Sequence, residues 1–341
     1  AGSPTHQLPR PLTLNSLPLL CSPTGLWGRS VHWDTVRSYL DRLDSPTTTY
    51  HVHVSNSNQL FDTYAGVDTC GDRLCRELDE LVRSDEHADA ECISFIGHSM
   101  GGLITRNAVA KAYDRKTKKL VLGGRPLEPT HFLSLATPHV GFADAERCPM
   151  ESAWYIPFSR RLVPFVSSRV LGEAGRQFFH RDESKLILRM ASHEQLEGLR
   201  AFKTRTAYGN VSGDHLVGWG NASLRDELEM DAVRAEIEAL RDVKHRGVVR
   251  EDAVDAAWRG CDDRWSHPRS SPGAAPESQA AARANISSLG WRRVDVSFRD
   301  ARLSGLAHQH IMTQRKRLNA IGEQTARHVA QSFALYEGTS S

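Results

Sequence analysis

A chain of 341 residues, 40% apolar and 25% charged, has the composition of a globular protein and is long enough for one large core. Its 43 basic and 41 acidic residues nearly cancel, and this balance argues against nucleic acid as a partner. No apolar run approaches the ~20 residues that span a bilayer, so we expect any membrane association to be peripheral.

The six cysteines show neither a CxxC pair nor a Cys/His ligand spacing. This pattern is typical of a reducing compartment and argues against a disulfide framework or a zinc site. We therefore expect a cytoplasmic protein, free or peripheral on membranes or lipid droplets, and predict no metal or other cofactor. The sequence leaves the oligomeric state open.

The first third of the chain predicts alternating structure after an irregular start. Residues 1–24 are rich in Pro, Ser, Thr and Leu without a sustained period, and we interpret them as an irregular N-terminal segment. Apolar spacing over Val31–Leu43 and over Thr69–Arg83 predicts two amphipathic helices. The period-two alternation of His51–Val54 predicts a strand between them.

Two histidines of that strand, His51 and His53, raise the question of a metal site, because alternate residues point to the same side of a strand. No third ligand lies nearby in the sequence. We therefore assign both side chains a structural role.

The clearest motif follows a short apolar run that begins at Cys92 and predicts a buried strand. The sequence Gly-His-Ser-Met-Gly-Gly occupies Gly97–Gly102, and an Ala-rich helical segment continues to Tyr113. A Gly-x-Ser-x-Gly motif between a strand and a helix predicts a nucleophile elbow, in which a strained turn exposes the serine hydroxyl. Ser99 is the candidate nucleophile, and the NH of Met100 is free to bind an oxyanion at the helix start.

The middle of the chain predicts a further strand at His131–Ala136. Strands that alternate with helices in this way favour an α/β fold with a mostly parallel, doubly wound sheet. Residues 148–202 are then rich in aromatic side chains and lack strand alternation. They fit equally a helical cap-like insertion that forms an apolar acyl-chain pocket and surface helices that pack on the sheet.

The last part predicts strands at Thr204–Tyr208 and Trp291–Phe298, and a C-terminal helix beyond them. Between these strands, residues 246–288 combine charge with Pro, Ser, Ala and Gly, and we interpret them as a low-complexity surface insertion. We expect a single domain over residues 25–335, followed by a tail at 336–341.

Ser99, Asp214 and His308 occur in the chain order Ser, Asp, His that α/β-hydrolases use. A serine hydroxyl is a weak nucleophile until a neutral imidazole takes its proton, and the carboxylate orients that imidazole and stabilises its cation. His310, two residues after His308, is the alternative base.

These residues resemble the DUF676 serine esterases and lipases, a lipase-like branch of the α/β-hydrolases. The resemblance extends over most of residues 25–335 and is carried by the following motifs: Gly25-Leu26-Trp27-Gly28, Gly97 to Arg106, Ala136-Thr137-Pro138-His139-Val140-Gly141, Asp214-His215-Leu216-Val217-Gly218-Trp219 and Ala307-His308-Gln309-His310-Ile311. It implies that Ser99 is the nucleophile, Asp214 the acid and His308 the base. It also implies an oxyanion hole made by the backbone NH groups of Met100 and Leu26.

One departure from the family is the segment before Leu26. Thr24 stands where the family has a histidine, and Pro23 removes a backbone donor where the incoming strand should pair. This predicts a weakly anchored loop around Leu26.

The function expected from the sequence is hydrolysis of carboxylic esters through an acyl-enzyme, with lipid or other acyl-chain esters as substrates. Two alternatives stay open. The same triad could serve a thioesterase or an acyltransferase, and an impaired hydrolase fold could act as a binding or scaffold protein.

Overall fold

The computed structural model describes residues 18–21, 25–42, 50–142, 169–239, 247–252, 275–301, 303–313 and 320–337. Several predictions concern residues outside these ranges: the Pro23–Thr24 segment, the aromatic residues between 148 and 168, the low-complexity residues 253–274 and most of the tail.

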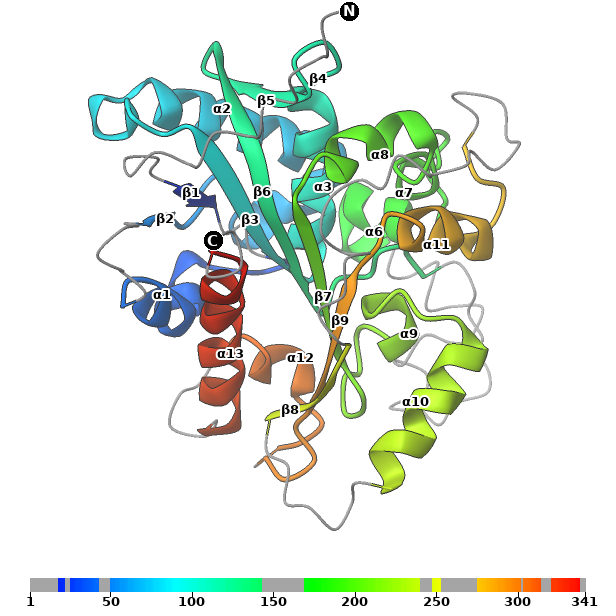
Figure 1. Cartoon of the computed structure of the whole chain (residues 1–341). Helices are drawn as coiled ribbons and strands as arrows, with labels where there is room; N and C mark the ends of the chain where they lie inside the picture. Colours follow the sequence, from blue (N-terminus) through cyan, green and yellow to red (C-terminus); the bar gives the residue numbers. More distant parts are fainter. Residues whose placement is uncertain are drawn as a thin grey trace, which may run out of the picture.

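Strands and helices alternate along the described chain (Figure 1). The strands are β1 (Pro18–Cys21), β2 (His51–His53), β3 (Cys92–His98), β4 (Tyr113–Asp114), β5 (Lys119–Leu122), β6 (Arg125–Leu135), β7 (Thr204–Asn210), β8 (Gly247–Glu251) and β9 (Arg292–Ser297). The α-helices are α1 (Asp34–Leu40), α2 (Val67–Arg83), α3 (Met100–Ala112), α6 (Gly172–Phe178), α7 (Leu186–Arg189), α8 (His193–Arg200), α9 (Trp219–Ala222), α10 (Glu227–Ala239), α11 (Gln279–Ser287), α12 (Ala307–His310) and α13 (Ala320–Glu337). Short 3-10 helices are η1 (Ser30–Trp33), η2 (Leu60–Ala65) and η3 (Asp85–His87).

The sheet has the strand order β2-β1-β3-β6-β7-β9-β8. Neighbours from β2 to β9 are parallel, whereas β8 is antiparallel to β9 and β5 is antiparallel to β6. The predicted mostly parallel α/β fold is confirmed. Because parallel strands end at the same edge, this topology places the residues after β3, β7 and β9 near one another.

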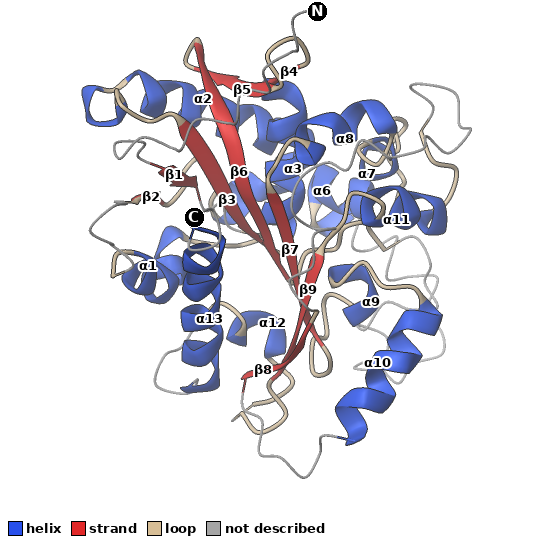
Figure 2. Cartoon of the chain, viewed as in Figure 1, coloured by secondary structure: helices blue, strands red, loops and turns tan. Residues whose placement is uncertain are grey.

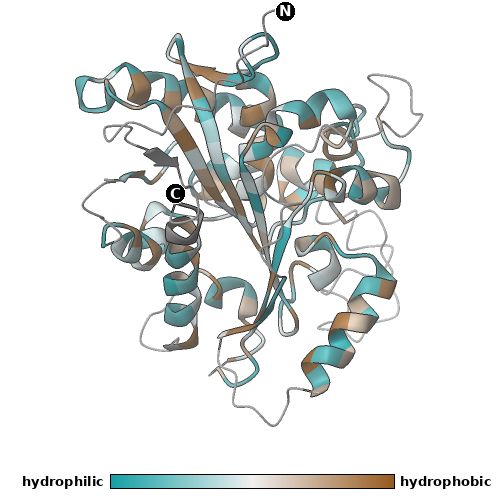
Figure 3. Ribbon diagram, viewed as in Figure 1, coloured by the Kyte–Doolittle hydropathy of each residue, from teal (hydrophilic) through white to brown (hydrophobic). Residues whose placement is uncertain are grey.

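Helices cover both faces of the sheet (Figure 2). Phe95 of β3 packs in the core under α2, α3 and α8, while Ile96 packs in the opposite core with residues of α1 and α13. Successive strand residues point to opposite faces, so one strand supplies both cores. The hydropathy colours of Figure 3 show β3 as largely hydrophobic and β9 as largely hydrophilic.

The interpretation of residues 1–24 as irregular is wrong for β1. These four residues pair with β2 on one side and with β3 on the other. Their sequence, Pro-Leu-Leu-Cys, shows no period-two alternation that would predict a strand.

The interpretation of residues 246–288 as a surface insertion is wrong at both ends of that range. β8 adds an antiparallel edge strand to β9. α11 buries Ala282 and Ile286 in the core shared with α2 and α3. The sequence did not predict this packing, because α11 is short and its few large apolar residues lie in an Ala- and Ser-rich stretch.

The described part of residues 148–202 contains both a helix that packs on the sheet layer and side chains that line a cavity. α8 packs against α3 as an ordinary covering helix. By contrast, Phe178 and Phe179, at the end of α6, face the cavity that contains Ser99. Among the described residues, no helix is both long and apolar enough to cross a membrane.

Candidate active site

The strand-to-helix turn from β3 to α3 presents Ser99 in a strained conformation. Its φ of 55° and ψ of −129° lie where residues other than glycine are rare. The NH of Ser99 donates to the carbonyl of Leu135 at the end of β6, with 2.8 Å between N and O. A Cβ on Gly97 would lie 2.5 Å from Cα of Gly102, so the crossing of strand and helix leaves no room for a side chain.

Asp214, in the loop after β7 that we call the acid loop, takes part in four hydrogen bonds with described residues of this loop, β7 and α12. Oδ1 accepts from the NH groups of Leu216 and Val217 at 2.9 and 2.8 Å. Oδ2 accepts from Nδ2 of Asn210 at 2.7 Å and from Nδ1 of His308 at 3.0 Å. Burial acts to raise the pKa of Asp214, but the charge of His308 and these donors outweigh it and lower the pKa. Asp214 is therefore a carboxylate at neutral pH.

His308 connects this carboxylate to the serine. A β-bridge between Asp214 and Leu306 brings the start of α12 next to the acid loop. With its Nδ1–H donated to Asp214, the ring leaves Nε2 as an acceptor, 2.9 Å from Oγ of Ser99. The structure thus brings together the three predicted residues, in the geometry of a serine hydroxyl that donates to a base.

The alternative base, His310, does not reach the serine. Its Nε2 lies 3.0 Å from the carbonyl oxygen of Leu303, and its ring packs on Phe298. On a helix, residues two positions apart point ~200° away from each other, so His308 and His310 face opposite sides of α12.

His98, inside the elbow motif, contacts both the backbone and the ring of His308. Its Nε2–H donates to the backbone carbonyl of His308 at 3.0 Å, and the two ring centroids are 4.8 Å apart. Complete burial, together with the nearby charge of His308, lowers the pKa of His98 to about 3. His98 is therefore a neutral, hydrogen-bonded neighbour of the base.

The loop at Gly25–Gly28 runs directly over the elbow. A Cβ on Gly25 would lie 2.6 Å from Cβ of Ser99. The prediction that this loop is weakly anchored is wrong for its described residues. The carbonyl of Gly28 accepts from the NH of Leu60, and Nε1 of Trp27 donates to the hydroxyl of Tyr64 at 2.6 Å. Two residues of η2, Leu60 and Tyr64, thus hold the loop that carries Leu26.

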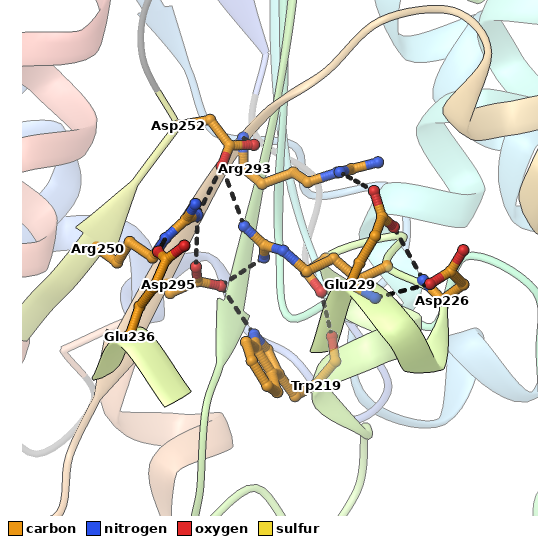
Figure 4. Close-up of polar contacts among 10 residues, drawn as sticks. Trp219, Asp226, Glu229, Glu236, Arg250, Asp252, Arg293 and Asp295 are labelled. Atoms are coloured by element: carbon orange, nitrogen blue, oxygen red, sulfur yellow. Dashed lines mark hydrogen bonds and ion pairs between the residues drawn. The ribbon is translucent and has the colours of Figure 1, made fainter. Parts of the chain in front are cut away.

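An ionic network surrounds Trp219, which follows Asp214 by five residues in the sequence, and the pair Arg225 and Asp295 in it is buried (Figure 4). Nε1 of Trp219 donates to Oδ1 of Asp295 at 2.8 Å, and the guanidinium of Arg225 contacts the same oxygen at 2.6 Å. Asp252 and Arg250 extend the network to β8. Burial raises the pKa of Asp295, although the charge of Arg225 opposes this shift.

The sequence predicts neither this network nor the role of Asn210. Asp295 lies on β9 and Arg225 lies just before α10, far apart in the sequence. One feature of the sequence could have indicated the network: Asp295 stands among the apolar residues of a predicted strand. A carboxylate buried in this way requires partners.

Ser99 lines a cavity of about 490 Å³. Its lining is mainly apolar, with His98, His215, His308 and Gln309 among the polar residues. The apolar lining consists of Leu26, Trp27, Trp33, Pro138, Phe142, Val170, Leu171, Phe178, Phe179, Leu216, Val217 and Met312. A cavity of this size and character can hold the apolar part of a small ligand against the serine.

Comparison with known families shows to which family the chain belongs. Residues 19–224, more than half of the chain, match the model described as "Putative serine esterase (DUF676)". The chain belongs to the DUF676 family. The matched residues include β1, the elbow and Asp214, whereas His308 lies beyond them.

Two yeast proteins are similar to this DUF676 chain. It is 26% identical over 200 residues to "Putative lipase ROG1" of Saccharomyces cerevisiae, covering 56% of this chain and 26% of the relative. It is 33% identical over 136 residues to "Putative lipase YDL109C" of the same yeast, covering 39% and 18%. The chain thus matches about a quarter or less of the length of these relatives.

Solved structures give more distant likenesses. Phospholipase PlaB from Legionella pneumophila aligns over 58% of this chain and 38% of its own, with 15% identity and a TM-score of 0.37. Lipase BlEst2 from Bacillus licheniformis aligns over 65% and 83%, with 14% identity and a TM-score of 0.38. The description of this family as putative serine esterases is consistent with the arrangement of Ser99, His308 and Asp214.

Proposed function

We propose that this DUF676 protein hydrolyses carboxylic esters through an acyl-enzyme formed on Ser99. The observation that carries the proposal is the continuous chain of hydrogen bonds from Ser99 through His308 to Asp214. An imidazole with one nitrogen on a carboxylate and the other on a serine hydroxyl is arranged for nucleophilic catalysis.

In the proposed reaction, Oγ of Ser99 attacks the ester carbonyl while its proton passes to Nε2 of His308. The imidazolium is stabilised by Asp214, and the oxyanion lies against the NH groups of Met100 and Leu26. Collapse of this intermediate breaks the bond to the alkoxy group, which leaves as an alcohol with the proton from His308. Water then repeats the sequence on the acyl-enzyme, releases the acid and restores Ser99.

The substrates we propose are lipid or other acyl-chain esters. The apolar cavity next to Ser99 supports this class, because an acyl chain gains free energy when its methylenes leave water. Trp27 and Val170 line the cavity and are also exposed, at 47% and 58%. Tyr64 contacts both Trp27 and the exposed ring of Phe61, so apolar side chains extend from the cavity to the surface. This surface is consistent with peripheral contact with a membrane or lipid droplet.

Covalent labelling with a fluorophosphonate tests the proposal, because the reagent reacts with an activated serine rather than with serines in general. We expect intact mass to show one added group and peptide mapping to place it on Ser99. Ser99→Ala should abolish labelling, and His308→Ala should slow it by at least ~10³-fold. His310→Ala is the matched control and should label like the wild type.

A folded protein that is not labelled would refute the proposal and leave a binding or scaffold role. Labelling that persists in His308→Ala but is lost in His310→Ala would reassign the base. Hydrolysis of p-nitrophenyl esters of increasing acyl length then tests the substrate class, and equal rates for acetate and octanoate would contradict an acyl-chain pocket.

A further inference from the structure

A second group of chemically active side chains lies away from the triad. His51 is on β2, whereas Glu86 and His87 are in η3, between α2 and β3. One potential ligand atom from each of the three side chains lies within 4.8 Å of the others. The rings of His51 and His87 are nearly perpendicular, with centroids 5.0 Å apart.

This cluster is at the opposite end of the sheet from the elbow. His51 pairs with Leu19 of β1, which pairs in turn with Ile93 of β3. Ile93 precedes Ser99 by six residues, so the cluster is ~20 Å from the serine along the strand direction. It therefore forms no part of the candidate active site.

His87 is the clearest indication of a ligand. Its side chain is buried, with the residue 6% exposed, and its Nδ1 has no hydrogen-bond partner among the described residues. A buried polar atom without a partner is costly, and in native proteins it usually meets water, an ion or a ligand. An imidazole nitrogen without a hydrogen-bond partner is available to coordinate a cation.

The backbone around η3 is fixed by Arg125 at the start of β6. Its guanidinium donates to the carbonyls of Val82, His87 and Ala90 at 3.1, 2.9 and 2.7 Å. These three bonds hold the segment between α2 and β3 before any ligand arrives. Preorganisation of this kind reduces the entropy lost on metal binding.

The cluster opens into a polar cavity of about 550 Å³ that His51 and Glu86 help to line. His53 lines the same cavity, but its Nε2 is bound to Glu77 at 3.1 Å. This bond explains why His53 is not one of the three converging side chains. The cavity provides access for a cation and room for its water ligands.

We propose that His51, His87 and Glu86 form a binding site for one Zn²⁺ ion. Two imidazole nitrogens and one carboxylate oxygen suit zinc, which takes four ligands and would keep one water on the cavity side. The ion would connect the edge strand β2 to the α2–β3 connection. Such a bond stabilises the fold by RT ln(1 + [Zn²⁺]/Kd) and is independent of ester hydrolysis.

The experiment uses untagged protein stripped with a chelator and then titrated with ZnCl₂ by isothermal calorimetry. We expect one ion per chain and a higher melting temperature in zinc. Because Glu86 is exposed, Glu86→Gln leaves the fold intact and should weaken binding at least ~10-fold, while His51→Ala should weaken it at least ~100-fold. Glu91→Gln removes an equal charge from a nearby exposed residue outside the cluster and should bind like the wild type.

Spectroscopy of the Co²⁺-substituted protein provides a readout of the ligands themselves. Four-coordinate cobalt gives an intense visible spectrum, which we expect in the wild type and in Glu91→Gln but not in His51→Ala. Failure of the wild type to bind zinc at micromolar concentration would overturn the proposal. Undiminished binding in both His51→Ala and Glu86→Gln would also overturn it, because the ion would then be bound elsewhere.

Discussion

The two halves of the candidate active site are built in different ways. Ser99 is held by backbone geometry within one continuous stretch, where β3 turns into α3. Asp214 and His308 are held by side-chain and backbone hydrogen bonds from Asn210, the acid loop and His98. The Trp219–Asp295–Arg225 contacts join segments far apart in the chain.

This difference predicts which kind of substitution should impair each half of the site. At the elbow there is no spare volume, so added atoms should displace the reacting groups. In the acid–base half the carboxylate oxygens of Asp214 and the ring nitrogens of His308 are all paired, so removal of one donor or acceptor should leave another buried and unsatisfied. Three substitutions test this contrast, in order of decreasing expected effect, and a fourth, outside both halves, gives a reference for a smaller electrostatic effect.

The largest effect is expected for Asp214→Asn. The amide keeps the size of the side chain but removes the charge and disfavours the tautomer that frees Nε2 of His308, so kcat should fall by ~10⁴-fold. Steady-state hydrolysis of p-nitrophenyl butyrate measures the loss, with thermal unfolding to verify the fold. A decrease below tenfold would mean that Asp214 does not orient the base.

Gly25→Ala should have the next largest effect. The new Cβ would lie 2.6 Å from Cβ of Ser99, so the loop with Leu26 must move away and weaken the oxyanion hole. Loss of one such donor costs ~10² to 10³ in kcat. Gly305→Ala is the matched control, because a Cβ there meets no atom within 4 Å. Equal rates for both variants would show that the loop does not contribute to catalysis.

Trp219→Phe tests the network around Trp219. It removes the indole donor from buried Asp295, and we expect the free energy of unfolding to fall by ~1 to 3 kcal/mol. Trp27→Phe removes a comparable but exposed bond to Tyr64 and should cost less than ~0.5 kcal/mol. Urea unfolding distinguishes the two. A larger loss for Trp27→Phe would contradict the importance assigned to burial.

The smallest effect concerns Glu77, outside both halves. Burial acts to raise its pKa, but hydrogen bonds from His53, Ser55 and Asn56 lower it from 4.5 to about 2. Its contribution to stability is therefore complete above pH 4.5 and is lost as pH falls toward 2.

Glu77→Gln should thus remove on the order of 1 kcal/mol of acid-sensitive stability, measured as the change in unfolding free energy between pH 6 and pH 3. Glu80→Gln, on the exposed side of the same helix, should keep the wild-type pH dependence. A variant at Glu77 with that same dependence would refute the assignment. Ester hydrolysis at pH 7 should be unchanged in both variants.

Much of this fold follows from local spacing along the chain. The elbow could be located because Gly97, Ser99 and Gly101 are consecutive parts of one turn, and the periods of β3, β7, α2 and α3 are properties of short segments. β1 could not be predicted from the sequence, because a strand of four residues is too short to show a period. Its hydrogen bonds come from β2 and β3, which are distant in the sequence.

By itself, the sequence determined the α/β class, the elbow and the chain order of Ser99, Asp214 and His308. The tertiary structure decided what depends on contacts between distant segments: the orientation of His308 rather than His310 toward Ser99, the donation from Asn210 to Asp214 and the pairing of Asp295 with Arg225. It also placed Glu86 and His87 beside His51, where the neighbouring sequence offered no such group. Spacing in sequence fixes the faces of a strand or helix, whereas side chains from separate elements meet only when the whole core packs.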